Sequence, residues 1–124
     1  MNREILFRGK SSAGWIYGDL IHLSGSVLIK PLLNMASPVQ PATVGQYTGF
    51  YDKNGNRIFE GDILRAVRKG RERICHTEYS GDSFYVPEFH WNLSDVDFDY
   101  QIEIVGNIHD NPELISKNCG DDEE

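Results

Sequence analysis

The chain has 124 residues, of which 40% are hydrophobic and 25% are charged, a composition typical of a globular domain. This length predicts one domain that buries about two-thirds of its unfolded surface without help from a metal or a disulfide. No apolar run approaches the ~18 residues of a membrane span, and no apolar segment follows the Met-Asn-Arg-Glu start, so we expect neither a membrane span nor a secretory signal. Cys75 and Cys119 are therefore expected to be reduced thiols in a cytoplasmic protein.

The net charge of −7 is distributed unevenly along the chain. Residues 1–75 hold 11 Lys and Arg against 6 Asp and Glu, which gives +5, and residues 76–124 hold 1 against 13, which gives −12. Such asymmetry can mark a surface for nucleic acid or for a basic partner. Strands from both halves must pair in a domain this small, however, and this pairing favours local neutralisation.

The first third of the chain predicts short strands separated by turns. Residues 3–8, 15–23 and 27–30 have strand character, and Gly18 within the second strand indicates a bulge or a close backbone approach. Residues 31–42 contain three prolines and no periodicity, so we expect an irregular loop there.

The central segment, residues 44–66, predicts a β-meander. Asn54-Gly55 between two apolar runs is a strong hairpin signal, and we expect both residues at positive φ in a two-residue type I′ turn. The aromatic residues of this segment and of the second predicted strand should pack in the core, with an exposed aromatic groove for a peptide as the alternative; they are Tyr47, Phe50, Tyr51, Phe59, Trp15 and Tyr17. Lys69-Gly70 predicts the tip of a second hairpin, followed by a return strand over residues 74–79.

In the last third, residues 83–86 and 101–108 are predicted strands. Residues 89–100 alternate Asp with apolar side chains, which indicates a half-buried edge strand or an acidic loop. Asn111 followed by Pro112 predicts a short C-terminal helix that runs to about Lys117, and residues 121–124 form an acidic tail.

No spacing in the sequence supports catalysis. The histidines and cysteines lack the spacings typical of metal sites, so that we expect no metal and no cofactor, and Cys75 lies among apolar residues, where thiols are inert. On a strand, Asp95, Asp97 and Asp99 would share one face and act as a solvated edge. A cryptic hydrolase that uses these carboxylates, Cys75 or His76 is kept only as a remote alternative.

The basic hairpin is the candidate partner-binding site, formed by Arg65, Arg68, Lys69, Arg71 and Arg73. Small β-barrels bind nucleic acid through basic faces that also carry aromatic residues. No aromatic residue interleaves these five in the sequence, and the negative net charge repels phosphate. A solvated hairpin tip is therefore favoured over a nucleic-acid site.

Three blocks of this sequence are VGQYTGFYDKNGNRIFEGDIL (44–64), FRGK with GWIYG near the start, and IEIVGNIHDNPEL (102–114). Together and in this order they resemble the YopX family of bacteriophages and prophages. The resemblance implies a mostly-β fold similar to an SH3-like barrel, and it implies no established activity. Together with the predicted elements, we expect one such domain over residues 1–120, with additional strands and a short C-terminal helix. We expect a non-enzymatic phage accessory protein in the bacterial cytoplasm that binds a protein partner, with nucleic-acid binding as the alternative; a homo-oligomer is left open.

Overall fold

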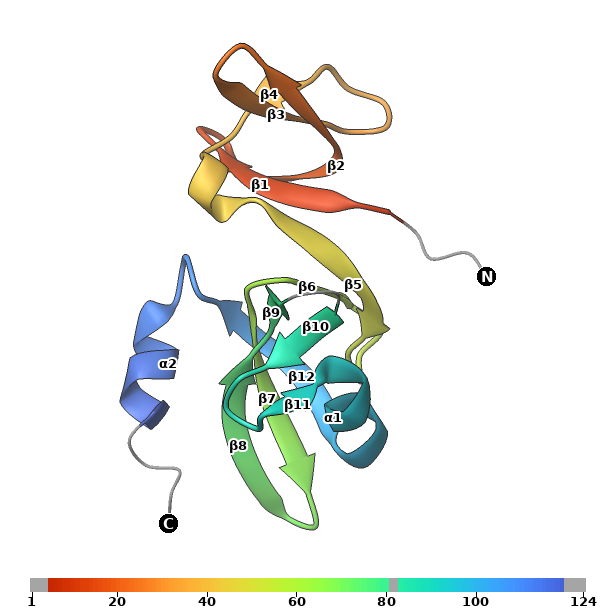
Figure 1. Cartoon of the computed structure of the whole chain (residues 1–124), viewed down its shortest axis with the longest axis vertical. Helices are drawn as coiled ribbons and strands as arrows, with labels where there is room; N and C mark the ends of the chain where they lie inside the picture. The colour runs from red at the N-terminus through yellow and green to blue at the C-terminus, as the bar shows by residue number, and fades with distance from the viewer. Residues whose placement is uncertain (1–4, 81–82, 120–124) are drawn as a thin grey trace. The chain divides into compact units, whose positions relative to one another are not determined.

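The computed structural model describes residues 5–80 and 83–119. These residues form two compact units, Met1–Gly49 and Phe50–Glu124. Both units are built from antiparallel strands, and two short α-helices lie in the second (Figure 1). The mostly-β class with a short C-terminal helix is thereby confirmed. A closed SH3-like barrel and a single domain over residues 1–120 stay predictions.

The first unit is an antiparallel sheet with the strand order β4-β3-β2-β1-β5. Its strands are β1 (Phe7–Ser11), β2 (Gly14–Leu23), β3 (Ser26–Lys30), β4 (Ser37–Pro38) and β5 (Gly45–Tyr51), which continues into the second unit; a 3-10 helix spans Pro41–Thr43. The second and third predicted strands are confirmed. The first begins at Phe7, later than predicted, and residues 3 and 4 lie outside the described part of the chain.

Gly18 is the close backbone approach that the sequence predicted. A Cβ at this position would lie 2.0 Å from the carbonyl oxygen of Lys30. No side-chain atom can be accommodated at that distance, so the close approach of β2 to the end of β3 requires glycine.

The second unit contains two three-stranded antiparallel sheets, with the orders β12-β7-β8 and β11-β10-β9. Its elements are β6 (Arg57–Phe59), β7 (Asp62–Arg68), β8 (Arg71–His76), β9 (Glu78–Ser80), β10 (Ser83–Val86), β11 (Trp91–Asn92), α1 (Leu93–Asp99), β12 (Gln101–Asn107) and α2 (Pro112–Cys119). The predicted strands 83–86 and 101–108 are confirmed. The return strand predicted at 74–79 starts earlier, at Arg71, and Thr77 interrupts it between β8 and β9.

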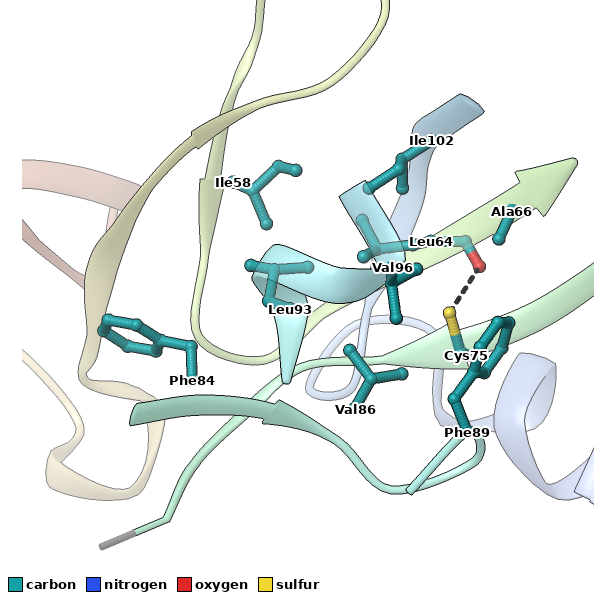
Figure 2. Packing of buried hydrophobic residues seen from close by; sticks show 10 residues of the cluster. All are labelled: Ile58, Leu64, Ala66, Cys75, Phe84, Val86, Phe89, Leu93, Val96 and Ile102. Atoms are coloured by element: carbon teal, nitrogen blue, oxygen red, sulfur yellow. Dashed lines mark hydrogen bonds between the residues drawn. The ribbon is translucent and has the colours of Figure 1, made fainter. Parts of the chain in front are cut away.

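The core of the second unit joins its two sheets to α1. Figure 2 shows ten buried side chains of this cluster: Ile58, Leu64, Ala66, Cys75, Phe84, Val86, Phe89, Leu93, Val96 and Ile102. Leu64 and Cys75 are register partners on β7 and β8, so both point to the same face of their sheet. Alternation along β7 and β10 and the helical spacing of Leu93 and Val96 therefore bury one shared apolar surface.

The central turn differs from the predicted type I′ hairpin. Of its two predicted turn residues, Gly55 has a positive φ of 86°, whereas Asn54 is not among the residues with positive φ. The Gly55 N–H donates to the Asp52 carbonyl (2.9 Å), and the Asp52 N–H donates to the Asn56 carbonyl (2.8 Å). This pattern is typical of a three-residue loop in which a left-handed glycine follows a type I turn.

The Asp52 side chain explains why this longer turn forms. Its Oδ1 accepts hydrogen bonds from the N–H groups of Asn54 and Asn56, both at 2.9 Å, and its Oδ2 accepts one from the N–H of Ile104 on β12 at 3.0 Å. The carboxylate therefore fixes the turn and ties it to the neighbouring sheet. Burial alone would raise the pKa of Asp52, but the hydrogen bonds from Ile104, Asn56 and Asn54 together lower it.

The interpretation of residues 89–100 as an edge strand or acidic loop holds only for β11, which is at the edge of its sheet, and is wrong for residues 93–99, which form α1. Leu93 and Val96 are fully buried and Phe98 is 87% exposed, an arrangement that a helix produces and a strand cannot. Asp95, Asp97 and Asp99 consequently do not share one face. Within the described residues, no helix is long and apolar enough to cross a membrane.

Candidate binding surface

The β7–β8 hairpin has the two-residue turn that its sequence predicts. Lys69 and Gly70 adopt φ values of 55° and 79°, and Arg68 pairs with Arg71 across the turn. Positive φ at both central residues is the signature of a type I′ turn. The sequence therefore placed the five basic residues on the correct hairpin.

Arg65 does not contribute free positive charge to this hairpin. Its Nη1 donates to Glu72 at 2.7 Å and its Nη2 donates to Glu103 at 2.9 Å. The hydrogen bond to Glu103, followed by that to Glu72, raises the pKa of Arg65, and Arg65 in turn lowers the pKa of Glu103. Arg65 thus links three strands, β7, β8 and β12, and the carboxylates of Glu72 and Glu103 balance its charge.

Arg73 and Arg68 lie against aromatic rings instead. The guanidinium carbon of Arg73 lies 4.3 Å from the centroid of the Phe89 ring, and its Nη2 donates to the Glu88 carbonyl at 2.9 Å. The guanidinium of Arg68 lies 5.9 Å from the centroid of Tyr100. Both distances fall within the range of cation–π contacts. Lys69 and Arg71 are exposed at the tip.

The two rings that meet these arginines form an aromatic cluster together with Trp91. Phe89 and Tyr100 have centroids 5.0 Å apart, Phe89 and Trp91 6.1 Å, and Trp91 and Tyr100 6.4 Å, all in edge-to-face arrangements. Trp91 is 38% exposed, whereas Phe89 is buried. We call Arg68, Arg73, Phe89, Trp91 and Tyr100 the arginine–aromatic face.

Sequence reasoning missed this face because the aromatic residues lie 16 to 32 positions beyond the arginines they meet. The statement that no aromatic residue accompanies the basic residues is correct along the sequence and wrong in space. One signal could have revealed part of it. The spacing of Leu93, Val96 and Tyr100 is helical, and a helix ending at Asp99 delivers Tyr100 to the start of β12, next to β7.

A histidine between two carboxylates holds the turn that precedes Trp91. His76 Nδ1 lies 2.6 Å from Glu88 Oε2, and His76 Nε2 lies 2.8 Å from Glu78 Oε2. The N–H of His76 also donates to Glu88 Oε1 at 3.1 Å. A neutral imidazole donates from one ring nitrogen only, so acceptors on both sides favour the imidazolium.

The pKa values of this pair move in opposite directions. The hydrogen bond to Glu88 raises the pKa of His76, against the lowering effect of burial, and Glu78 adds to the rise. Burial would raise the pKa of Glu88, but the hydrogen bonds and the charge of His76 lower it. Glu88 is therefore the anchor of the 87–90 turn on β8, through its side chain to His76 and its carbonyl to Arg73.

The remaining residues considered for catalysis are not brought together. Cys75 is fully buried, and its thiol faces the Leu64 carbonyl at 3.7 Å (Figure 2). It points into the core, whereas its neighbour His76 faces Glu78 and Glu88 on the other side of β8. Burial raises the pKa of Asp97. Within residues 5–80 and 83–119, no group of three or more His, Cys, Asp and Glu side chains is arranged to hold a metal ion.

Comparison with known proteins supports the resemblance seen in the sequence. No curated protein matches this chain. The family described as YopX protein matches residues 15–116, a range that begins in β2, includes the whole β7–β8 hairpin and ends within α2. The chain therefore belongs to the YopX family.

Proposed function

We propose that this YopX-family chain is a non-enzymatic binding module that binds a protein partner through the arginine–aromatic face. The proposal includes the role of an accessory protein of a bacteriophage or prophage, acting in the bacterial cytoplasm. It also includes a more specific fold than mostly-β, namely an SH3-like barrel. The observation that carries it is the exposed Trp91, set in an aromatic cluster that two arginines flank.

The composition of this face supports a protein partner. Trp, Tyr and Arg are the residue types enriched at the centres of protein interfaces, where a few of them carry most of the binding energy. Arg73 and Phe89 are held by the Glu88 turn, so the face is preorganised and loses little side-chain freedom on binding. Trp91 adds a large apolar surface that is already partly desolvated by Tyr100 and Phe89.

The test compares capture by Trp91→Ala with capture by the parent. Immobilised parent protein is exposed to a host lysate, and the captured proteins are quantified by mass spectrometry. We expect Trp91→Ala to weaken binding of the specific partner about ten-fold or more, as truncation of an interface hot spot does. Tyr17→Ala, which removes a 45% exposed aromatic ring from the first unit, serves as the matched control and should leave capture unchanged.

Two results would overturn this proposal. One is undiminished capture by Trp91→Ala after circular dichroism has verified its fold. The other is an equal loss in Trp91→Ala and Tyr17→Ala, which would mean general adhesion by exposed rings rather than one binding face.

Turnover of a substrate that persists in Trp91→Ala would point instead to an enzyme. Full activity after Cys75→Ser would then exclude a thiol hydrolase.

Single-stranded nucleic acid is the second candidate partner, and the rings beside the arginines favour it. Bases stack on exposed aromatic side chains while arginines and lysines follow the backbone. Trp91 would supply the stacking surface, and Arg68, Lys69 and Arg71 the phosphate contacts. The ion pairs of Arg65 and the net charge of −7 work against phosphate, which is why a protein partner is favoured.

Salt dependence separates the two partners. Binding of a fluorescent single-stranded oligonucleotide through these contacts should be measurable at about 50 mM salt and collapse by about 200 mM. Replacing Arg68, Lys69 and Arg71 by Glu should abolish it. A control that replaces Lys30, Lys53 and Arg57 by Glu changes the net charge equally. Similar losses in both triple variants would show a net-charge effect, and no binding by the parent at low salt excludes nucleic acid.

A further inference from the structure

The segment between β3 and β4 projects three large apolar side chains into solvent. Leu32, Leu33 and Met35 are 88%, 89% and 85% exposed. We call residues 31–36 the apolar loop. Single exposed apolar residues are common on protein surfaces, but three on six residues form a patch of the kind that marks an interaction site.

The apolar loop is anchored at both ends. The Asn34 N–H donates to the Pro31 carbonyl at 3.4 Å, which makes a turn inside the loop. After the loop, β4 pairs with β3 through Ser37 and Pro38, and the Val39 N–H donates to the Val27 carbonyl at 3.0 Å. Fixed ends limit the conformational freedom that the loop would lose on binding.

A groove of about 570 Å³ begins where the apolar loop ends. Its walls are residues 10–13, at the turn between β1 and β2, and residues 37–41. Val39 is 8% exposed and packs so tightly against Gly9 that a Cβ there would lie 2.9 Å from Val39 Cγ2. The volume is in the range of sites that hold small ligands or a few side chains.

A backbone hydrogen bond and the Thr43 hydroxyl keep the two walls of the groove in place. The Gln40 N–H donates to the Lys10 carbonyl at 2.9 Å, and the Lys10 N–H donates to the Thr43 hydroxyl at 2.9 Å. The Thr43 hydroxyl in turn donates to the Gln40 carbonyl at 2.6 Å. The groove is therefore formed before any occupant arrives.

The loop and most of the groove lie in a stretch of the sequence with few charges, although Lys10 stands in the groove wall. From Leu20 to Tyr51, Lys30 is the only residue among Asp, Glu, Lys and Arg, in a chain of which 25% is charged. Depletion of charged residues is what distinguishes the core of a protein interface from the rest of a surface. It also removes the carboxylates that would make two copies of a chain with net charge −7 repel each other at this site.

We propose that the apolar loop of one copy of this chain binds the groove of a second copy. The loop and the groove meet at Ser37, so a two-fold axis near this residue places each loop in the partner's groove. Such an interface is isologous, since the same surface of both copies takes part. Leu32, Leu33 and Met35 fill the groove over Pro38 and Val39. This inference concerns the first unit and is independent of the partner bound at the arginine–aromatic face.

Sedimentation equilibrium of the purified full chain measures this association. We expect a monomer–dimer equilibrium with Kd in about the micromolar range, as suits an interface of modest size. Replacing Leu32, Leu33 and Met35 by Ser should weaken it at least ten-fold. Ala13→Trp, which adds a ring to the groove wall at an exposed turn, should weaken it as much. Phe98→Ser removes an equally exposed side chain, at 87%, and should leave the dimer intact.

Mixing the two defective variants tests whether loop and groove bind each other. The Ala13→Trp chain keeps its loop and the triple-serine chain keeps its groove, so their mixture should form heterodimers that neither variant forms alone. A parent that stays monomeric up to about 1 mM would overturn the proposal. A mixture that forms no heterodimers would also overturn it. A monomeric parent that binds neutral phosphatidylcholine vesicles through the loop would overturn it as well. None of these results would alter capture through Trp91.

Discussion

Replacing Glu88 by Gln should destabilise the second unit more than the same change at Glu78, although both side chains contact His76. The Glu88 side chain is 13% exposed and that of Glu78 is 52% exposed. A hydrogen bond between charged, largely buried groups contributes about 1.5–3 kcal/mol, whereas a solvated ion pair contributes about 0–1 kcal/mol. We therefore expect Glu88→Gln to lower the free energy of unfolding by about 2 kcal/mol and Glu78→Gln by less than about 1 kcal/mol.

The pH dependence of this stabilisation follows from the directions of the two pKa shifts. The pKa of His76 is raised in the folded state, so its contribution is fully present below the unfolded value of about 6.5 and is lost as the pH rises through the raised value. The pKa of Glu88 is lowered. Its contribution is present above the unfolded value of about 4.3 and is lost as the pH falls through the lowered value.

Urea denaturation of the parent and the two variants from acid to alkaline pH measures both effects. The free energy of unfolding of the parent should fall as the pH rises from about 6.5 through the raised pKa of His76, and this fall should be shallower in Glu88→Gln. His76 can also be followed directly, because its ring protons report the raised pKa by NMR. The reasoning is refuted if Glu78→Gln costs as much as Glu88→Gln, or if the His76 pKa is unchanged in Glu88→Gln.

Three further substitutions test the backbone, each by chemical denaturation beside the parent. Gly18→Ala should cost about 3 kcal/mol or more, because the new Cβ would meet the Lys30 carbonyl oxygen at 2.0 Å; a loss under ~1 kcal/mol would contradict this close approach. Gly55→Val should cost about 1–3 kcal/mol from backbone strain alone, since no atom lies within 4 Å of that Cβ, and equal midpoints would show that the left-handed turn is absent. Asp52→Ala should cost about 3–5 kcal/mol because three backbone donors lose their acceptor, and Asp52→Asn should cost less than Asp52→Ala. A larger loss in Asp52→Asn would mean that the carboxylate does not hold the turn to Ile104.

Turn residues and strand periodicity account for the parts of the fold that were predictable. Lys69-Gly70 and Asn111-Pro112 act through local backbone conformation, which the neighbouring sequence specifies, whereas Gly18 is required by the Lys30 carbonyl on the next strand. Accordingly β2, the β7–β8 hairpin and the start of α2 lie where they were predicted. The central turn shows the limit of this reasoning. Asn54-Gly55 would favour a two-residue turn, but the Asp52 side chain supplies hydrogen bonds that select a longer one.

The segment 93–100 was misread because its sequence satisfies two periods at once. Asp95, Asp97 and Asp99 alternate with apolar residues as in a half-buried strand, and Leu93, Val96 and Tyr100 have helical spacing. A run this short cannot decide between them from local preference. Burial of Leu93 and Val96 in the core decides for the helix, and it does so at the expense of Phe98, which becomes 87% exposed. Tertiary packing thus decides between two local patterns.

The candidate site shows why charge along a sequence is a poor guide to charge on a surface. Five basic residues within nine positions suggested a cationic hairpin, yet each residue has a different environment. Carboxylates from β8 and β12 neutralise Arg65. Arg73 lies against Phe89 of the 87–90 turn, Arg68 lies near Tyr100 at the end of α1, and Arg68, Lys69 and Arg71 are exposed. What this face offers a partner is therefore the partly exposed ring of Trp91 and two guanidinium groups that lie against neighbouring rings. Such a surface distinguishes partners by shape and hydrogen bonding, so its affinity for a protein should respond weakly to salt.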